Sequence, residues 1–505
     1  MLRRIKLSYF AIIISLINLV LYHLPFYKFV CNNINIRSLE GILLLVSITI
    51  LAIVLNALVF YLVLFLLRFI GKCLLVIFFN INAIAVYFIS TYGVILDGTM
   101  IGNVLNTNFE ESSSFLSFSL FLYLILLGVL PSILIFKIKV VNVKLKTFGV
   151  HFSLTLIFLL LLIYANSVNW LWIDKNAKVL GGLVMPWSYV VNTGRYYNHE
   201  KKENKQQILL PNATVTDNAK SVAVLVIGES ARSSNFSLYG YERNTNPLLS
   251  KIENVRHFKA EACATYTTAS LKCILEYKNT RKLFEILPNY LFRNGIEVIW
   301  RTTNWGEPTV KVKNFQRKDD LKKLCNGDGC EYDEVLLSGL KEQILASEKN
   351  KILVVLHTST SHGPTYYKKY PQQFNVFEPV CTSVELADCS HEELINAYDN
   401  TIIYTDYILA TLIEELKQLD GYKTTMIYIS DHGESLGENN LYMHGIPVSI
   451  APKEQFEIPF IVWASDGSKE IKHNDILSQH NIFHSVLDFL AIESPIYDEN
   501  MSIFN

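Results

Sequence analysis

The stretch Ser221-Val-Ala-Val-Leu-Val-Ile-Gly-Glu-Ser230 contains a continuous apolar run, Val222–Ile227, which ends in the polar cluster Gly228-Glu-Ser230. Two later stretches repeat this pattern: Ile352–Leu356 ends at His357, and Met426–Ile429 ends at Ser430-Asp-His432. Apolar runs without polar alternation are typical of strands that are covered on both faces, and the stretch 392–418 between two of them has helical periodicity. The pattern predicts an α/β domain over residues 220–505.

The amino-acid composition separates this domain from the first third of the chain. Of 505 residues, 50% are hydrophobic and 18% are charged, below the roughly 25% charge of an ordinary soluble domain. Residues 1–166 contain 11 Lys and Arg and 4 Asp and Glu, whereas the remaining residues are mildly acidic. This distribution excludes a disordered chain, a small disulfide scaffold and a strongly basic nucleic-acid-binding protein, so we expect no nucleic-acid partner.

Five stretches of the first third are long and apolar enough to cross about 30 Å of hydrocarbon as helices. They predict an all-α transmembrane domain over residues 1–166, with spans near 8–27, 42–67, 72–92, 114–136 and 147–165. We expect the first span to be retained as an anchor, because Pro25-Phe-Tyr27 follows its apolar run in place of a small-residue cleavage site.

The positions of the cations predict the orientation of these spans. Nine Lys and Arg residues lie before span one, between spans two and three, and between spans four and five, whereas the other loops hold only Lys28 and Arg37. Because Lys and Arg near span ends resist translocation, we expect a cytoplasmic N-terminus and an outward-facing C-terminal part. Residues 167–219 are interpreted as a Trp-rich segment on the outer membrane surface followed by a linker; an ordinary surface helix is the alternative for the Trp-rich part.

Six of the eight cysteines lie in the outer part of the chain. They form three close pairs: Cys263 with Cys273, Cys325 with Cys330, and Cys381 with Cys389. An even count at short spacing in an outward-facing segment predicts three local disulfides in an oxidising compartment. Zinc-binding cysteines are the alternative, but separations of 10, 5 and 8 residues do not match C-x₂-C ribbons.

Polar residues gather where the predicted strands end, and open sheets bind ligands at the carboxyl ends of their strands. Glu229, Asp431 and His432 offer the carboxylate and imidazole ligands that suit a cation such as Zn²⁺. A metal beside the hydroxyl of Thr267 would lower its pKa and make it a nucleophile for a phosphoryl group. Taken singly, each residue is more often a helix cap, a surface group or a core filler, so only their combination favours a site.

Three further histidines fall in other loops. His357, His362 and His444 can hold phosphate oxygens or a second cation.

Several motifs then resemble those of one family. The chain is similar to the lipid A phosphoethanolamine transferases of Gram-negative inner membranes, which include the mobile colistin-resistance enzymes and belong to the alkaline phosphatase and sulfatase superfamily. The motifs are Val226-Ile-Gly-Glu-Ser-Ala-Arg232, Ser237-Leu-Tyr-Gly-Tyr241, Ser361-His-Gly-Pro364, Ser430-Asp-His-Gly-Glu-Ser-Leu-Gly-Glu-Asn439, Tyr442-Met-His-Gly-Ile-Pro447 and Ala451-Pro-Lys-Glu454.

The resemblance implies roles for individual residues. Glu229, Thr267, Asp431 and His432 would hold the catalytic zinc, and Thr267 would be phosphorylated during turnover. His357 and His444 would act as acid or base, and His362 and His444 would line the phosphoethanolamine site or a second, weaker zinc site. The membrane loop at residues 103–111 is similar to a family segment that binds the head group of the donor lipid. The resemblance therefore assigns Asn103, Thr107 and Glu111 to that head group. The cysteine pairs match the family's local disulfides.

Two residues near Thr267 depart from the family pattern. The family usually has Cys-Gly-Thr-x-Thr and later Val-Pro-Cys, whereas this chain has Ala264 after Cys263 and Lys272 before Cys273. Alanine disfavours the positive φ that glycine adopts, and Lys272 adds a cation beside the predicted disulfide. These departures bear on the acceptor preference more than on the reaction, and a basic residue there would favour an anionic substrate.

The resemblance implies a multi-pass protein of the bacterial inner membrane with its catalytic domain in the periplasm. In a two-step transfer, Thr267 would attack phosphatidylethanolamine, release diacylglycerol, and pass phosphoethanolamine to lipid A, another glycan or a periplasmic protein. The added ethanolamine cation would lower the affinity of cationic peptides such as polymyxin for the surface. The alternatives are a phosphoglycerol transferase of the lipoteichoic acid synthase type and a non-catalytic membrane receptor on the same fold; a sulfatase is disfavoured because no C-x-P-x-R or S-x-P-x-R stretch is present.

Overall fold

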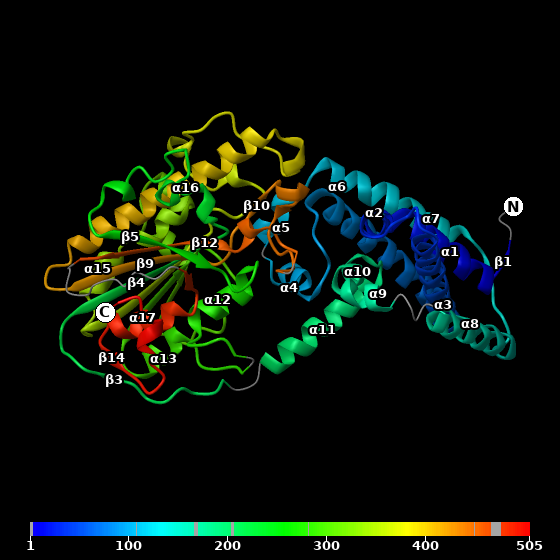
Figure 1. Cartoon of the computed structure of the whole chain (residues 1–505), viewed down its shortest axis with the longest axis horizontal. Coiled ribbons are helices and arrows are strands. Elements are labelled where there is room, and N and C mark those ends of the chain that lie inside the picture. The colour runs from blue at the N-terminus through cyan, green and yellow to red at the C-terminus, as the bar shows by residue number, and fades with distance from the viewer. Residues whose placement is uncertain are drawn as a thin grey trace. The chain divides into compact units, whose positions relative to one another are not determined.

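The chain divides into two compact units in the computed structural model (Figure 1). The N-terminal unit comprises Met1–Leu105 and Phe115–Glu200, and the C-terminal unit comprises Asn106–Ser114 and Lys201–Asn505. The structure describes residues 4–107, 109–165, 170–203, 207–280, 282–448, 450–465 and 476–504. The short segment Asn106–Ser114, which the sequence places between two predicted spans, therefore belongs to the C-terminal unit.

The first apolar stretch of the N-terminal unit is bent. α1 (Leu7–Tyr22) and α2 (Leu24–Asn33) meet at His23 with an angle of 68° between them. The single straight helix that the sequence predicts over 8–27 is therefore replaced by two shorter helices. Pro25 explains the break, because it fits the first turn of α2, whereas inside a continuous helix its ring would clash with the preceding turn.

α3 (Leu39–Tyr92) contains two of the predicted spans and is broken between them. Arg68 has a non-helical backbone, with φ of 46° and ψ of −107°. A Cβ atom on Gly71 would lie 3.0 Å from the carbonyl oxygen of Val63, whereas residues eight apart in a straight helix are separated by about 12 Å. The chain therefore folds back on itself at Arg68, between the predicted spans 42–67 and 72–92.

The remaining helices of the N-terminal unit follow the other apolar stretches. Among the described residues, Leu39–Tyr92, Phe118–Lys137 and Leu145–Tyr164 are long and apolar enough to cross a membrane, and the bent pair α1 and α2 would make a fourth span. Five crossings, which require both arms of α3 to span, stay a prediction. The elements are α4 (Gly98–Asn106), α6 (Phe118–Tyr123), the π-helix η1 (Leu124–Val129), α7 (Leu130–Lys137), α8 (Leu145–Ala165), α9 (Trp170–Lys175), α10 (Ala177–Leu183), α11 (Trp187–Glu203) and the paired strands β1 (Ile5–Lys6) and β2 (Val140–Val141).

An eight-stranded mixed sheet forms the centre of the C-terminal unit. β4 is flanked by β9 and β8, and both pairings are parallel, whereas β12 runs antiparallel to β9 and β5. The α/β class predicted for this part is confirmed. In spatial order the strands are β13 (Leu477–Ser478), β5 (Val255–Glu261), β12 (Glu457–Ala464), β9 (Lys423–Ser430), β4 (Ser221–Gly228), β8 (Lys351–His357), β6 (Glu297–Thr302) and β7 (Asn314–Arg317).

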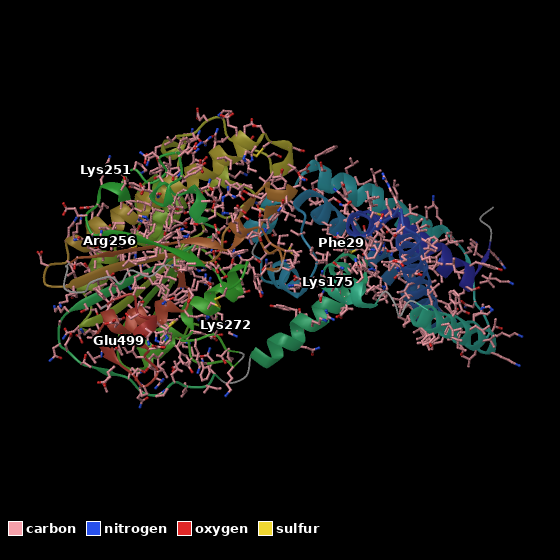
Figure 2. The ribbon with its side chains drawn as sticks, viewed as in Figure 1. Phe29, Lys175, Lys251, Arg256, Lys272 and Glu499 are labelled. Carbon is pink, nitrogen blue, oxygen red and sulfur yellow. A yellow bond between two sulfur atoms is a disulfide. The ribbon has the colours of Figure 1, made fainter. Side chains whose placement is uncertain are left out.

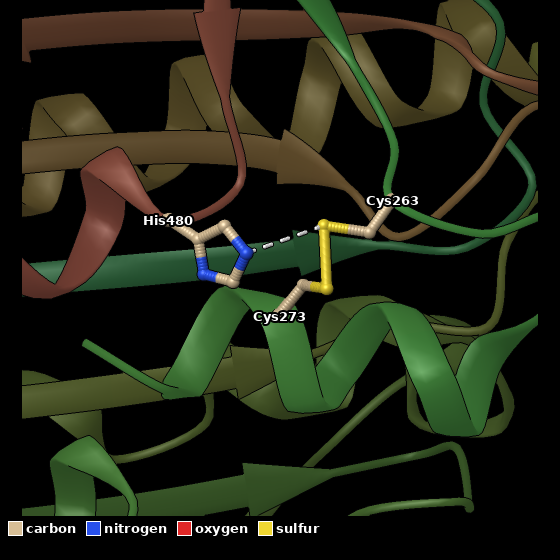
Figure 3. Close-up of side chains that lie close together, drawn as sticks. All are labelled: Cys263, Cys273 and His480. Carbon is tan, nitrogen blue, oxygen red and sulfur yellow. Dashed lines mark hydrogen bonds between the residues drawn. A yellow bond between two sulfur atoms is a disulfide. The ribbon is translucent and has the colours of Figure 1, made fainter. Parts of the chain in front are cut away.

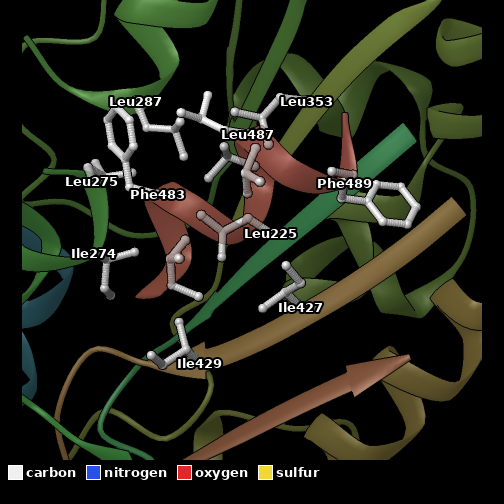
Figure 4. Close-up of a cluster of buried hydrophobic side chains, with 14 of the residues drawn as sticks. Leu225, Ile274, Leu275, Leu287, Leu353, Ile427, Ile429, Phe483, Leu487 and Phe489 are labelled. Carbon is white, nitrogen blue, oxygen red and sulfur yellow. The ribbon is translucent and has the colours of Figure 1, made fainter. Parts of the chain in front are cut away.

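Helices cover both faces of this sheet. α12 (Thr267–Leu275), α13 (Leu287–Arg293) and α17 (Asn481–Phe489) pack on one face, where Leu225 and Ile427 meet Phe483 and Leu487 (Figure 4). α15 (Leu340–Leu345) and α16 (His391–Lys417) lie on the other side of the sheet (Figure 1). Every residue of β4 is buried, which explains why its sequence is apolar without alternation.

Short elements complete the C-terminal unit and carry several of its loops. They are α5 (Phe109–Ser114), α14 (Lys318–Leu321), the antiparallel pair β10 (Ser435–Leu436) and β11 (Tyr442–Met443), and the antiparallel pair β3 (Thr214–Val215) and β14 (Ile492–Glu493).

Candidate active site

Glu229 and Asp431 follow two neighbouring parallel strands. Gly228, the last residue of β4, pairs with Ser430, the last residue of β9, so the next residue of each strand emerges at the same edge of the sheet. Both carboxylates and the adjacent His432 are no more than 2% exposed. The register of this strand pair thus brings together residues that are about 200 positions apart in the sequence.

Thr267 lies against these residues at the first position of α12. Its Oγ1 is 3.4 Å from Glu229 Oε2 and 3.3 Å from His432 Nε2. His432 Nε2 is in turn 3.4 Å from Glu229 Oε1 and 3.3 Å from Asp431 Oδ2. The structure therefore gathers the four residues that the sequence analysis assigned to one cation. A helix N-terminus also favours the negative charge of a phosphoryl group on Thr267.

The free polar atoms of this cluster fit a cation. Asp431 Oδ1 accepts hydrogen bonds from the backbone N–H groups of Ser230 and His432 at 3.0 and 2.7 Å, whereas its buried Oδ2 accepts no hydrogen bond among the described residues and faces His432 Nε2 at 3.3 Å. His432 Nδ1 lies 2.9 Å from the carbonyl oxygen of Gly433, so Nδ1 carries a proton, and in the neutral imidazole the Nε2 lone pair is free to bind a cation in place of a second proton. A carboxylate oxygen and an imidazole lone pair at one point are ligands that Zn²⁺ prefers.

The electrostatics of the two carboxylates also favour a cation. Burial, together with the negative charge of Glu229, raises the pKa of Asp431 far above its usual range. Burial opposes the ionisation of Glu229 as well, but the positive charges of His432, His362 and His444 outweigh it and hold the pKa of Glu229 below its usual value. Both carboxylates lie within 3.4 Å of His432 Nε2, and a positive charge between them would favour the ionised form of both.

His362 and His444 belong to the same cluster. The ring centroids of His432 and His444 are 4.2 Å apart, and those of His444 and His362 are 5.2 Å apart. One ligand atom each from Glu229, His432 and His444 lies within 4.8 Å of the other two. His444, which the sequence analysis assigned to substrate or to a second cation, therefore lies beside the first cation's ligands.

His357 lies apart from this cluster. It is the last residue of β8 and fully buried, its Nδ1 is 3.2 Å from Thr302 Oγ1, and its Nε2 has no hydrogen-bond partner among the described residues. Burial lowers its pKa, so the imidazole is held neutral. No hydrogen bond joins it to Thr267 or to the three proposed ligands within the described ranges, although the charge of Glu229 acts on its pKa. Its assignment as a catalytic acid or base stays a prediction.

Glu434 and Ser230 are site residues that the sequence analysis did not single out. Glu434 is fully buried, burial raises its pKa to about 8, and its Oε1 is 3.3 Å from His444 Nδ1. Ser230 has a positive φ of 53°, and its Oγ donates to Glu229 Oε1 at 2.7 Å. Both residues lie inside motifs that carry the family resemblance. Glu434 could have been predicted as a site residue, because it lies only two positions after His432.

The loop after β6 was also missed. Asn304 Nδ2 donates to Glu229 Oε2 at 2.6 Å and to the Thr358 carbonyl oxygen at 2.8 Å, so it orients that carboxylate. Asn304 also follows the carboxyl end of a strand, where ligand-binding residues are expected. Because Arg301 interrupts the apolar run of β6, the sequence analysis did not recognise this strand. The Arg301 guanidinium can be buried because it donates hydrogen bonds to the carbonyl oxygens of Leu336 and Ser338.

Gly306 in this loop lies directly against Thr267, the predicted nucleophile, so Gly306→Ala is expected to impair catalysis. Its φ is +92°, and a Cβ atom there would lie 3.3 Å from Cγ2 of both Thr267 and Thr268. We expect kcat to fall at least about tenfold, because a displacement of roughly 1 Å at a reacting group can cost a hundredfold. The measurement is steady-state kinetics of product formation by the purified full-length protein.

Gly421→Ala is the matched control for this variant. Gly421 also has a positive φ, of +80°, but no heavy atom lies within 4 Å of the position that a Cβ atom would take there. Both variants carry a similar backbone penalty of about 1–2 kcal/mol in the free energy of unfolding. An equal loss of kcat in the two would contradict a specific contact between Gly306 and Thr267.

The membrane-loop residues are divided between the two units. Asn103 lies on α4 in the N-terminal unit, whereas Thr107 belongs to the C-terminal unit and is half-buried. Glu111 lies on α5 of the C-terminal unit, but its side chain is outside the described residues. Their assignment to the donor head group stays a prediction.

All three predicted disulfides are present: Cys263–Cys273, Cys325–Cys330 and Cys381–Cys389. The first one joins the approach to Thr267 to the helix α12 that begins with Thr267, and His480 Nε2 lies 3.7 Å from Cys263 Sγ (Figure 3). The helix that begins with Thr267 is thus held covalently to the preceding loop.

The two departures from the family pattern have different structural consequences. Ala264 is buried and is not among the residues with positive φ, so its position does not require glycine. Lys272 lies on α12 (Figure 2), with its Nζ 3.9 Å from Oε1 of the nearly buried Glu276. The charge of Lys272 is therefore offset by a neighbouring acid, which weakens the expected attraction of an anionic substrate to this residue.

Comparisons with known proteins cover nearly the whole chain. Residues 221–492 match the sulfatase family model, and residues 43–201 match the model described as phosphoethanolamine transferase EptA/EptB. The chain is 42% identical over 500 residues to phosphoethanolamine transferase EptA of Helicobacter pylori, covering 96% of this chain and 94% of that protein. It is 35% identical over 430 residues to phosphatidylethanolamine transferase Mcr-1 of Escherichia coli, covering 78% and 79%.

A solved structure agrees with the whole fold. The integral membrane protein lipooligosaccharide phosphoethanolamine transferase A from Neisseria meningitidis superposes with a TM-score of 0.89 at 26% identity, and the match covers 99% of each chain.

Proposed function

Because this chain belongs to the phosphoethanolamine transferase family, we propose that it moves phosphoethanolamine from phosphatidylethanolamine to a phosphorylated glycolipid such as lipid A. The observation that carries the proposal is the Thr267 hydroxyl, which lies within 3.4 Å of both Glu229 and His432 at the end of the central strands. A hydroxyl in such surroundings is activated as a nucleophile. A receptor on the same fold would not need this constellation.

We assign one divalent cation, Zn²⁺, to Glu229, Thr267, Asp431 and His432. When bound, it would lower the pKa of the Thr267 hydroxyl and offset the negative charge of the donor phosphate. The unpartnered Asp431 Oδ2 and the His432 Nε2 lone pair support this assignment.

The transfer has two steps in this proposal. Thr267 Oγ1 forms a bond to the donor phosphorus while the bond from that phosphorus to the diacylglycerol oxygen breaks, and Glu229 Oε2 is placed to receive the hydroxyl proton. An oxygen of the acceptor then bonds to the phosphorus and its proton passes to His444, while the bond from the phosphorus to Thr267 Oγ1 breaks and Thr267 Oγ1 takes back its proton from Glu229. We assign the protonation of the diacylglycerol oxygen to His444, with His362 beside it to hold the phosphate.

The compartment follows from charge and disulfides. The cations of the spans predict a cytoplasmic N-terminus, and three disulfides in the C-terminal unit are typical of an oxidising compartment. We therefore propose that the protein resides in the bacterial inner membrane with its C-terminal unit in the periplasm, where donor and acceptor lipids are both present.

Purified full-length protein in vesicles tests this function. Vesicles containing phosphatidylethanolamine and lipid A are expected to yield diacylglycerol and lipid A that carries phosphoethanolamine, detected by mass spectrometry. A parallel reaction with phosphatidylglycerol tests the phosphoglycerol transferase alternative. Faster transfer from phosphatidylglycerol would contradict the proposed donor, and an absence of transfer from either lipid would favour the receptor.

A further inference from the structure

A polar cavity of about 260 Å³ in the C-terminal unit adjoins the catalytic cluster. Thr303, Asn304 and Trp305 of the loop after β6 form one side of it, and His362 forms another. The same loop contacts the reaction centre, because Asn304 donates to Glu229 at 2.6 Å and Gly306 packs against Thr267. A group bound in this cavity therefore lies beside the nucleophile.

Three lysines line this cavity: Lys318, Lys368 and Lys369. None of them forms an ion pair with any residue that the structure describes; Lys368 only lies over the ring of Tyr367. The acidic groups around Lys318 are already engaged, since Glu307 pairs with Arg317 at 2.8 Å and Asp320 pairs with Lys323 at 3.2 Å. Glu331 pairs with Lys322 at 2.6 Å, and that lysine, helped by the charge of Lys318, lowers the pKa of Glu331. The cavity wall therefore carries three lysines that have no close ion-pair partner among the described residues.

The loops that form the cavity are fixed from behind by one buried acid. Asp333 accepts hydrogen bonds from the hydroxyls of Thr303, Ser359 and Thr360 and from the backbone N–H of Ser359. This carboxylate joins the loop after β6 to the loop after β8. The sides of the cavity that Thr303 and Ser359 form are thus held together by one carboxylate.

We propose that Lys318, Lys368 and Lys369 form the acceptor subsite, which binds a phosphate group of the anionic glycolipid that receives phosphoethanolamine. This inference rests on the proposed function. The donor head group carries one phosphate and one ammonium, so three lysines attract its phosphate but repel its amine. A phosphorylated glycolipid carries negative charge without a compensating cation and gains from all three.

The size of the cavity agrees with this assignment. Sites for small molecules usually measure about 300–1,000 Å³, so a cavity of about 260 Å³ suits a phosphate with part of its sugar rather than a whole glycolipid. The subsite would therefore select acceptors by their phosphate and leave the acyl chains outside.

The triple variant Lys318→Gln/Lys368→Gln/Lys369→Gln tests the subsite in the full-length protein. The KM for bisphosphorylated lipid A is expected to rise at least tenfold, and the KM for phosphatidylethanolamine to change less than threefold. The wild type is expected to favour bisphosphorylated over monophosphorylated lipid A, and the triple variant to lose that preference. Lys368→Gln alone, at an exposed position, repeats the test if the triple variant does not fold.

The matched control removes the same charge elsewhere. The control variant is Lys341→Gln/Lys349→Gln/Lys417→Gln. These three lysines lie near the N-terminal ends of β8 and β9, whereas the site lies at the C-terminal ends of the strands. The control variant should therefore leave both KM values within threefold of the wild type. An equal rise of the donor KM would assign the lysines to the donor phosphate and overturn the proposal, as would an unchanged acceptor KM. If the wild type itself forms no product, the proposed function fails instead.

Discussion

Thr267→Ala is expected to abolish phosphoethanolamine transfer. Its hydroxyl is the only oxygen of that side chain available to carry the phosphoryl group, and it lies 3.3 Å from His432 Nε2 and 3.4 Å from Glu229 Oε2. Loss of a covalent nucleophile costs a thousandfold or more in kcat for enzymes that form such intermediates. Mass spectrometry of the lipid products from full-length protein in vesicles measures the loss, and a radiolabelled ethanolamine donor detects labelled protein in the wild type.

Two neighbouring changes serve as controls for this prediction. Thr267→Ser keeps a hydroxyl at the same position and should retain labelling of the protein, although at a reduced rate. Thr268→Ala changes the next residue of α12 and should reduce kcat far less than Thr267→Ala. Product formation that persists in Thr267→Ala at more than a few percent of the wild-type rate would remove Thr267 from the mechanism.

Asp431→Asn is expected to lower bound zinc to less than about a tenth of the wild-type content per chain. The substitution replaces a carboxylate whose Oδ2 is buried and unpartnered among the described residues, and an amide is a poor ligand for Zn²⁺. Transfer should fall at least about a thousandfold with it. Plasma mass spectrometry of the purified protein measures the zinc, and chelation of the wild type followed by addition of Zn²⁺ should reproduce and reverse the loss of activity.

Asp420→Asn is the control for the loss of one acidic group. Asp420 is exposed and precedes β9, near the opposite edge of the sheet, so its substitution should change neither zinc content nor activity. A zinc content in Asp431→Asn equal to that of the wild type would show that this carboxylate is not a ligand. A divalent ion other than zinc in the active wild type would correct the identity of the metal but keep the ligand set.

Much of the fold follows from local patterns. Continuous apolar runs at Val222–Ile227 and Met426–Ile429 predict covered strands, and both are central strands of the sheet. The predicted span over 8–27 was too simple, because Pro25 starts a second helix at an angle of 68°. The strand β6 escaped recognition because buried Arg301 interrupts it, and only the tertiary structure supplies the carbonyl oxygens that make its burial possible.

In the candidate site, too, some residues could be predicted from the sequence and others could not. Glu229, Asp431 and His432 could be predicted because parallel strands place their carboxyl ends at one edge. The sequence could not tell His444, which joins the cluster, from His357, which is buried apart from it. Both histidines follow short apolar segments, and their separation depends on how the loops after β11 and β8 fold back.

The sequence by itself determined the apolar N-terminal part, the α/β class and the disulfide pairs, because these depend on the periodicity of neighbouring residues or on short spacing. It also predicted that Glu229, Asp431 and His432 gather beside Thr267, because the polar residues follow the ends of apolar runs and the motifs resemble those of one family. Only the tertiary structure decided that Asn304 holds Glu229, that Gly306 contacts Thr267, and that three distant lysines line one cavity. These contacts join segments far apart in the chain, and their formation depends on loop paths that no local pattern of residue types specifies.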